Sequence, residues 1–186
     1  MDGGTTCHDV PGPSGSDLPK LRLPKSGSLR AGIADEDNPQ LARGYDLLRT
    51  RLLGPVTERG LTRIGVAQAA DRNASALTAL NLALSETRRL GRRVTLVDLD
   101  IAGQPVLRAL GAMPPIVLPS DDDPRAVNVA AINDGLTLIT VPAPAAVAAT
   151  RLLAPTFLAA AEARLARLCA DIIIVHLPPL LKGDAG

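Results

Sequence analysis

The chain has 186 residues, of which 46% are hydrophobic and only 1% aromatic. This length suits one domain with a substantial core, which must be built from aliphatic side chains. The 20 Lys and Arg residues against 19 Asp and Glu residues leave a net charge of +1, and no long basic run is present. Nucleic acid is therefore not an expected partner.

The cysteines and the N-terminus favour a cytoplasmic protein. Cys7 and Cys169 lie far apart in the chain and do not resemble the disulfide framework of a small secreted domain. The N-terminus lacks the basic and then apolar pattern of a secretion signal. The most apolar stretch, residues 141–161, is interrupted by prolines and an arginine, so it does not predict a membrane span.

The composition changes near residue 38. Residues 1–37 are rich in Gly, Pro, Ser and Asp, with little apolar periodicity, which predicts a flexible tail. Regular hydrophobic patterns begin after it. The sequence therefore predicts one domain over residues 38–186.

A helix is predicted to open this domain at Asn38-Pro39 and to end at Gly54-Pro55. Its apolar face consists of residues that recur every three or four positions: Leu41, Tyr45, Leu48 and Leu52. Four charged residues lie off this stripe: Arg43, Asp46, Arg49 and Arg51. They either contact a neighbouring subunit or simply face water.

A strand, a loop and a helix are predicted between residues 63 and 91. The apolar run at 64–67 is typical of a buried parallel strand, Asn73 suits a helix cap, and Gly91 ends the helix. The loop lies where a phosphate-binding loop is expected, and helix N-termini attract anions through their N–H groups. Its side chains do not suit phosphate, since it has no glycine or lysine and Asp71 adds a negative charge.

Residues 92–100 form a second predicted strand, which ends in two carboxylates. Asp98 and Asp100 point the same way if the strand continues, because side chains alternate along a strand. They then lie at the carboxyl end of a parallel strand, where α/β sheets bind ligands. The pair either holds magnesium or orients a water, or it serves as an ordinary helix cap.

The remaining elements continue the alternation of strands and helices. We expect a short helix at 106–110, a loop over 112–134, a strand at 135–141, a helix from about 156 to 169 and a strand at 171–176. This order predicts a mostly parallel sheet in a three-layer α/β fold. His176 ends the last strand on the ligand side, but a lone histidine is more often structural. The sequence places no serine or cysteine nucleophile beside it.

Four stretches in one order together resemble the bacterial tyrosine kinases of the polysaccharide-synthesis type. That family is a branch of the deviant P-loop ATPases, which also contain the MinD and ParA proteins. Residues 44–51 are similar to its N-terminal helix motif, 65–83 to its P-loop strand and helix, 94–100 to its Asp-x-Asp Walker motif, and 171–180 to its Walker B strand. The resemblance covers residues 38–186 and implies a Rossmann-like, P-loop NTPase-type fold.

Carried over residue by residue, the resemblance implies a nucleotide site that has lost its chemistry. The P-loop lysine falls on Ser75, the glycines fall on Arg72 and Ala74, and the Walker B aspartate falls on His176. The phosphate cation and the backbone freedom of the loop are therefore missing. The vestigial site comprises Arg72, Asn73, Ala74, Ser75, Asp98, Asp100 and His176. It implies no catalytic residue, no bound metal and no cofactor.

The predicted first helix also departs from the family pattern. The family has Glu-x-x-Arg-x-x-Arg, a subunit-contact motif, whereas this chain has Arg43, Asp46 and Arg49, so two of three charges are reversed. A different partner surface is therefore expected, in a homo- or hetero-oligomer. The chain ends at Gly186, soon after the Walker B-like strand, so we expect a sheet shortened at the C-terminus, in a naturally short protein or a fragment. Its open edge needs a partner or a cover.

The leading hypothesis is a catalytically degenerate tyrosine-kinase-like protein, a pseudokinase, acting as a binding or regulatory component of exopolysaccharide biosynthesis or export. The partner that the resemblance implies is the cytoplasmic region of a membrane polysaccharide chain-length (co-polymerase) protein, which would hold the chain peripherally at the inner membrane. The alternative is an active ATPase or protein-tyrosine autokinase that binds ATP and Mg²⁺ in an atypical site. A dinucleotide-binding protein ranks last, because no Gly-x-Gly-x-x-Gly follows a predicted strand.

Overall fold

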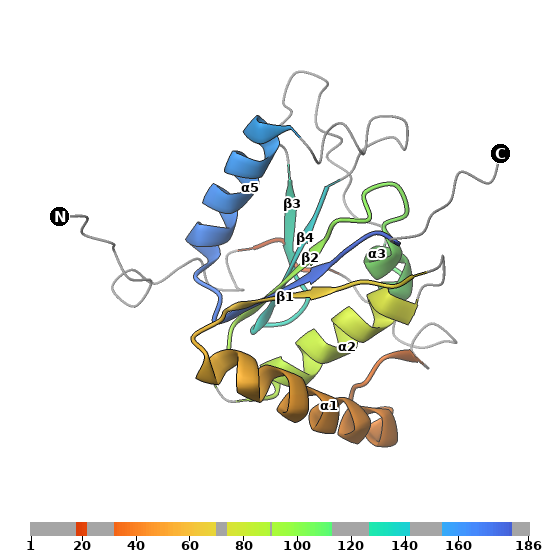
Figure 1. Cartoon of the computed structure of the whole chain (residues 1–186). Helices are drawn as coiled ribbons and strands as arrows, with labels where there is room; N and C mark the ends of the chain where they lie inside the picture. The colour runs from red at the N-terminus through yellow and green to blue at the C-terminus, as the bar shows by residue number, and fades with distance from the viewer. Residues whose placement is uncertain are drawn as a thin grey trace.

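A computed structural model describes residues 18–21, 32–69, 74–89, 91–112, 127–141 and 154–179. Within these ranges a five-stranded sheet lies between two helical layers (Figure 1). The strands are β1 (Arg63–Val66), β2 (Val94–Asp98), β3 (Asn128–Ala131), β4 (Leu136–Thr140) and β5 (Ile172–His176). The helices are α1 (Pro39–Glu58), α2 (Ala74–Thr87), α3 (Pro105–Leu110) and α5 (Pro155–Leu168).

The strand order is β1-β5-β2-β4-β3. All neighbours are parallel except β3, which is antiparallel to β4. In the described part of the chain β1 therefore forms one edge of the sheet and β3 the other. The predicted three-layer α/β fold with a mostly parallel sheet is confirmed.

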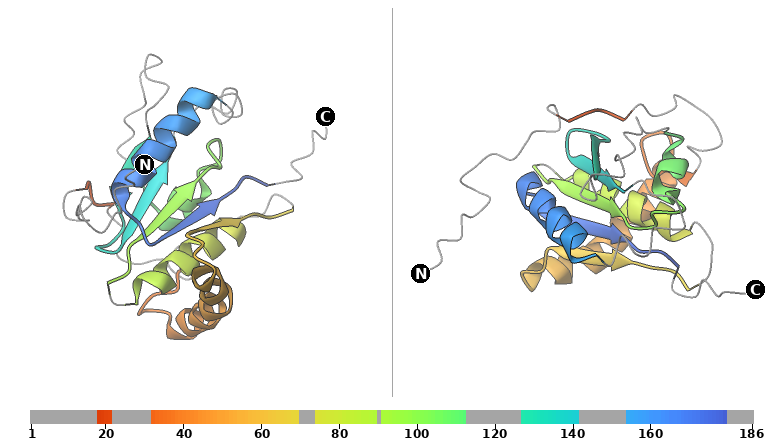
Figure 2. Two further views of the ribbon diagram at one scale, coloured as in Figure 1. Left: turned by 60° about the vertical axis from the view of Figure 1, so that its left-hand side comes forward. Right: turned by 90° about the horizontal axis from the view of Figure 1, so that it is seen from above.

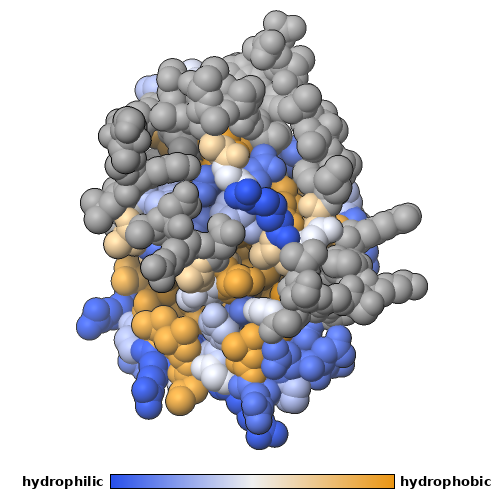
Figure 3. All heavy atoms as spheres, turned by 90° about the vertical axis from the view of Figure 1, so that its right-hand side faces the viewer, coloured by the Kyte–Doolittle hydropathy of each residue, from blue (hydrophilic) through white to orange (hydrophobic). Residues whose placement is uncertain are grey.

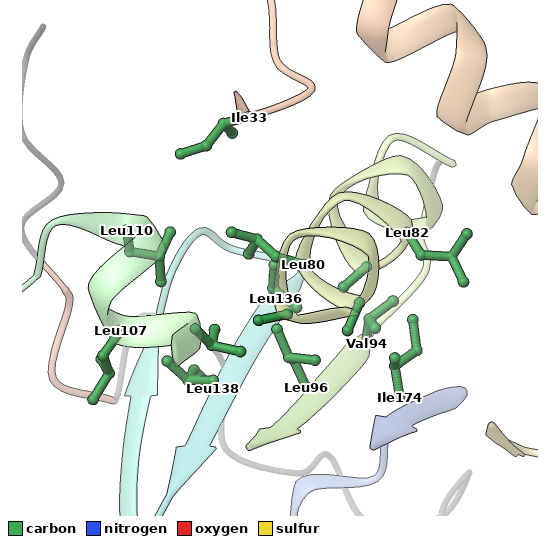
Figure 4. Packing of buried hydrophobic residues seen from close by; sticks show 14 of the residues in the cluster. Ile33, Leu80, Leu82, Val94, Leu96, Leu107, Leu110, Leu136, Leu138 and Ile174 are labelled. Atoms are coloured by element: carbon green, nitrogen blue, oxygen red, sulfur yellow. The ribbon is translucent and has the colours of Figure 1, made fainter. Parts of the chain in front are cut away.

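Both faces of the sheet are covered. Helices α1 and α2 lie on one side and α5 on the other (Figures 1 and 2). On the α2 side, Leu80 packs in one cluster with Leu96 of β2 and Ile174 of β5 (Figure 4). On the α5 side, the next residue along β2, Val97, packs in a cluster with Leu168. The inner strands β2 and β5 are apolar on both faces because helices cover both faces. The prediction of a buried strand at 64–67 is wrong in this respect, because β1 is an edge strand whose residues alternate between exposed and half-buried positions.

Helix α1 does not end at Gly54-Pro55 as predicted; it continues to Glu58. Proline lacks an N–H group, so Pro55 leaves one carbonyl of the preceding turn without its helical bond. The helix tolerates this because Leu53 is buried in the core, which offsets that loss. Leu52, predicted on the apolar face, is 45% exposed instead. Gly60 follows the C-cap residue Arg59, and its φ of +70° suits glycine.

Strand β3 is absent from the sequence prediction, which placed a loop over residues 112–134. Its side chains alternate between half-buried and buried positions, as at a half-covered sheet edge. The turn to β4 contains Asn133, whose side-chain oxygen accepts hydrogen bonds from the N–H groups of Gly135 and Leu136. An Asn-Asp-Gly turn after an alternating stretch is a hairpin signal, so the sequence contained the information.

Two stretches of the expected tail belong to the folded domain. Ala131 of β3 exchanges backbone hydrogen bonds with Pro19 and Leu21, at 2.9 and 2.8 Å. The Asn81 side chain of α2 bonds the backbone of residues 32 and 34. The physical reason is apolar burial, since both stretches bury aliphatic side chains in the core. A flexible tail up to residue 37 is thus wrong for residues 18–21 and 32–37.

Candidate functional site at the carboxyl ends of the strands

The sheet register brings three strand ends together. His176, the last residue of β5, is the register partner of Val66 on one side and of Asp98 on the other. These are the final residues of β1 and β2. The carboxyl ends of three adjacent strands therefore meet at His176, at the edge of the sheet where α/β proteins bind ligands.

Ser75 reaches this point from the start of α2. It is the second residue of the helix, it is 5% exposed, and its backbone N–H donates to the Gln68 side chain at 3.3 Å. Its Oγ lies 2.9 Å from Nε2 of His176. Two residues of the predicted nucleotide site, one from α2 and one from β5, are thus hydrogen-bonded to each other.

Asp98 holds the other side of the imidazole ring. Its Oδ1 lies 2.8 Å from Nδ1 of His176 and also accepts the N–H of Asp100 at 3.1 Å. Its Oδ2 accepts the N–H of Val106, in the first turn of α3, at 3.1 Å. A carboxylate bonded in this way acts as a cap for a helix N-terminus. The cap interpretation thus describes Asp98, which is 2% exposed.

Asp100 lies just beyond the end of β2 and is half-buried. Its Oδ1 accepts the N–H of Gly103 at 2.9 Å, within the turn that leads into α3. Because β2 ends at Asp98, the two carboxylates are used separately. Asp98 bonds two backbone N–H groups and the His176 ring, whereas Asp100 bonds one backbone N–H group. In the described part of the chain, no group of three or more His, Cys, Asp or Glu side chains is arranged to hold a metal ion.

Of the other predicted site residues, Ala74 begins α2 and is exposed, whereas Arg72 and Asn73 lie outside the described residues. The structure therefore describes five of the seven predicted site residues. Besides Ala74, four lie around the start of α2 and the ends of β2 and β5: Ser75, Asp98, Asp100 and His176. Three of these four are joined directly by side-chain hydrogen bonds.

The predicted partner-contact residues divide into two groups. Arg43 is exposed on α1. Asp46 and Arg49 instead bind α2 and the residue after it: Asp46 Oδ1 accepts from Arg88 at 2.6 Å and also from Ser85, and Arg49 Nη1 donates to the Ser85 carbonyl at 3.0 Å. Asp46 and Arg49 therefore join two helices of the same chain.

The environment of Asp46 favours its ionised form. Partial burial raises the pKa of this carboxyl, but the hydrogen bonds from Ser85 and Arg88 lower it. The positive charges of Arg88 and Arg49 lower the pKa further, and the net result lies below the ordinary value for an aspartate. The α1–α2 contact is therefore strongest with Asp46 charged.

Comparison with known proteins identifies the fold. No protein-family model and no curated protein sequence matches this chain. Among solved structures, a chain described as "BceF Tyrosine Kinase Domain" superposes with a TM-score of 0.59 at 16% sequence identity, covering 97% of this chain and 77% of the other. This chain has the fold of a tyrosine kinase domain. The Rossmann-like, P-loop-type α/β fold that the sequence predicted is thereby confirmed.

The contact between Ser75 and His176 was missed in the sequence. The two residues are 101 positions apart in the sequence but in contact in the structure. The expectation that no serine lies beside His176 is therefore wrong. The available signal was topological: a residue that follows the first strand and a residue that ends the neighbouring strand lie at the same edge of a parallel sheet. Using it required the strand order, which no local pattern contains.

Proposed function

We propose that this chain is a catalytically degenerate tyrosine-kinase-like protein that acts as a binding or regulatory component of exopolysaccharide biosynthesis or export. The shared fold with a tyrosine kinase domain supports the kinase-like scaffold. The polysaccharide role rests on the resemblance of the four sequence stretches. In this proposal the scaffold presents a surface to a partner and transfers no phosphate.

The single observation that carries the proposal is the bonding of Ser75 and Asp98 to the two ring nitrogens of His176. Phosphoryl transfer requires a cation on the transferring phosphate and a metal ion that neutralises developing charge. A serine hydroxyl and an imidazole that bond each other supply neither. Asp98 already accepts hydrogen bonds from His176, Asp100 and Val106, so this arrangement does not fit a magnesium ion without rearrangement.

Titration with nucleotide tests this proposal against an active ATPase or autokinase. We expect calorimetry of the full chain with ATP and MgCl₂ to show no saturable binding up to millimolar nucleotide. Micromolar binding that Asp98→Ala abolishes would favour the active alternative instead. The assay should be repeated with the partner present, because a lysine or arginine from the partner could complete the site.

The kinase assay has a simple readout, because Tyr45 is the only tyrosine in the chain. Autophosphorylation on tyrosine within this chain therefore has one acceptor, and Tyr45→Phe is the matched control. We expect no label from γ-labelled ATP on the wild-type chain. Label that appears on the wild type and is absent from Tyr45→Phe would overturn the degenerate assignment.

We further propose that the outer face of α1 contacts the partner. Arg43 and Leu47 are exposed and lie one turn apart, so they are on the same side of the helix. Leu47 is 55% exposed, so its apolar side chain is accessible to a partner. Figure 3 shows hydrophobic residues gathered in the lower part of the molecule, where α1 and α2 lie, bordered by hydrophilic ones. The proposed partner is the cytoplasmic region of a membrane polysaccharide chain-length protein.

A binding measurement with that cytoplasmic region, immobilised as a soluble fragment, tests this surface. We expect Arg43→Glu and Leu47→Asp each to weaken binding by about tenfold, which corresponds to about 1.4 kcal/mol. Arg164→Glu is the matched control, because Arg164 is exposed on α5, across the sheet from α1. Equal weakening by the control would show that net charge and not α1 determines binding.

A further inference from the structure

Ser75, His176 and Asp98 form one continuous line of hydrogen bonds. Ser75 Oγ is 2.9 Å from His176 Nε2, and His176 Nδ1 is 2.8 Å from Asp98 Oδ1. The three residues are 5%, 1% and 2% exposed. A hydroxyl, an imidazole and a carboxylate in this order are the components of a nucleophile, its general base and the group that orients the base.

We infer that this line of residues makes Ser75 a nucleophile for acyl transfer from small carboxylic esters to water. The inference does not rest on the proposed function, because a chain that transfers no phosphate can still carry an activated serine. Ser75 and His176 act on the substrate in this scheme, and Asp98 is the positioning residue.

The surroundings of Asp98 determine where the imidazole proton lies. Both carboxylate oxygens accept backbone N–H groups, from Asp100 and Val106, so Asp98 is an acceptor in this site. His176 must then donate its Nδ1–H to Asp98. In the neutral ring Nε2 carries a lone pair, which accepts the Ser75 hydroxyl proton. This is the tautomer that a general base requires.

The order of the elements around Ser75 is that of a strand–turn–helix nucleophile. Ser75 follows β1 at the start of α2, and its partners are the last residues of β5 and β2, the next two strands in the sheet. The chain order is serine, aspartate, histidine, the order found in α/β-hydrolases. N–H groups in the first turn of a helix have no carbonyl partner within that helix. The N–H of Ala76 is therefore the group that would stabilise an oxyanion formed beside Ser75.

The proposed reaction has two balanced halves. In the first, Ser75 Oγ bonds to the ester carbonyl carbon while its proton passes to His176 Nε2; the bond to the leaving oxygen then breaks, and that oxygen takes the proton from Nε2. In the second, water attacks the acyl-serine carbonyl and gives a proton to Nε2. The bond from Ser75 Oγ to the acyl carbon breaks, and Oγ recovers that proton, which releases the carboxylic acid.

The test uses the full wild-type chain with a short-chain alkyl fluorophosphonate and with p-nitrophenyl acetate. The small exposed fraction of Ser75 favours such small probes. We expect one equivalent of fluorophosphonate on Ser75, located by peptide mapping, and a burst of p-nitrophenol from the acetate. Because the peptide mapping uses the wild-type chain, a misfolded variant cannot be the reason for an absence of label. No label on Ser75 would overturn the inference.

Variants then separate a serine that His176 and Asp98 activate from a serine that reacts without them. We expect Ser75→Ala to abolish the label and Asp98→Asn to slow it by roughly 10⁴-fold, as when a triad carboxylate loses its charge and the tautomer is reversed. Thr78→Ala is the control, because the Thr78 hydroxyl lies one turn along α2 and bonds the Ala74 carbonyl outside the line. An Asp98→Asn or His176→Gln variant that remains folded by circular dichroism and labels at the wild-type rate would overturn the inference.

Discussion

Asp46 of α1 and Arg88, the residue after α2, form an ion pair in which Nη2 and Oδ1 are 2.6 Å apart. Arg88 also donates to the carbonyl of Ala34 at 2.8 Å. One guanidinium therefore joins α1, the end of α2 and the stretch that precedes α1. In this structure Asp46 therefore joins α1 to α2 within one chain.

Asp46→Asn should weaken the α1–α2 contact by about 1 kcal/mol, mainly through lost charge-assisted hydrogen bonds. The pKa of Asp46 is lower in the folded chain than in the unfolded chain, so its charge stabilises the fold above the unfolded-state pKa. That stabilisation is lost as pH falls through the folded-state pKa. Urea unfolding should therefore show a difference between wild type and variant at pH 7 that shrinks at pH 3. A pH-independent difference would contradict this.

Glu86 is a buried carboxylate surrounded by arginines. It is 0% exposed, and its oxygens lie 3.2 Å from Arg89 Nη1, 3.5 Å from Arg92 Nε and 3.8 Å from Arg49 Nε. Glu86→Gln removes the charge that these cations share, so we expect a loss of about 1–3 kcal/mol in the free energy of unfolding. Chemical denaturation measures it.

The matched control for Glu86→Gln is Glu162→Gln, which breaks an exposed pair with Arg63. Two hydrogen bonds of 2.6 and 2.7 Å join this pair, but both side chains are more than half exposed. Exposed ion pairs contribute about 0–1 kcal/mol, so the control should cost less. Equal losses in the two variants would mean that the burial of Glu86 does not increase its contribution to the free energy of unfolding.

Gly103 lies close against the Asp100 carboxylate. A Cβ added at position 103 would lie 2.7 Å from Oδ2 and 2.9 Å from Oδ1 of Asp100, closer than atoms in contact allow. Gly103→Ala should therefore displace the Asp100 carboxylate and lower the melting temperature, with a cost of about 1–3 kcal/mol. Thermal unfolding followed by circular dichroism measures this change.

Gly44→Ala is the control for Gly103→Ala. Gly44 lies inside α1, and a Cβ there would meet nothing within 4 Å. Because alanine has a higher helix propensity than glycine, this variant should gain up to about 1 kcal/mol. Similar destabilisation by both variants would indicate that the space beside Asp100 is not what requires glycine.

Asn81 holds residues 32–34 onto α2. Its Oδ1 accepts the N–H of Ala34 and its Nδ2 donates to the carbonyl of Gly32, both at 2.8 Å. Asn81→Ala leaves these backbone groups unpaired, at a cost of about 1–3 kcal/mol. Hydrogen exchange at the Ala34 amide should quicken at least tenfold, whereas Thr78→Ala on the same helix should leave it unchanged. An unchanged Ala34 amide in Asn81→Ala would refute the anchoring role.

The sequence determined much of this fold because its signals are local. Buried strands read as short apolar runs, α2 and α5 as periodic apolar positions, and the ends of helices as glycines at positive φ, such as Gly91 and Gly111. The same apolar runs placed Asp98 near the end of one strand and His176 at the end of the last strand. These features depend on neighbouring residues along the chain, which the sequence lists directly.

The tertiary structure alone decided which of these residues meet. The strand order places β5 between β1 and β2, and only this order brings His176 against both Ser75 and Asp98. Burial of Leu53 likewise stabilises the continuation of α1 beyond Pro55. Packing against the core also places residues 18–21 and 32–37 in the folded domain. Each of these outcomes depends on contacts between residues distant in sequence. Local propensity and periodicity carry no information about such contacts, and burial in three dimensions overrides them.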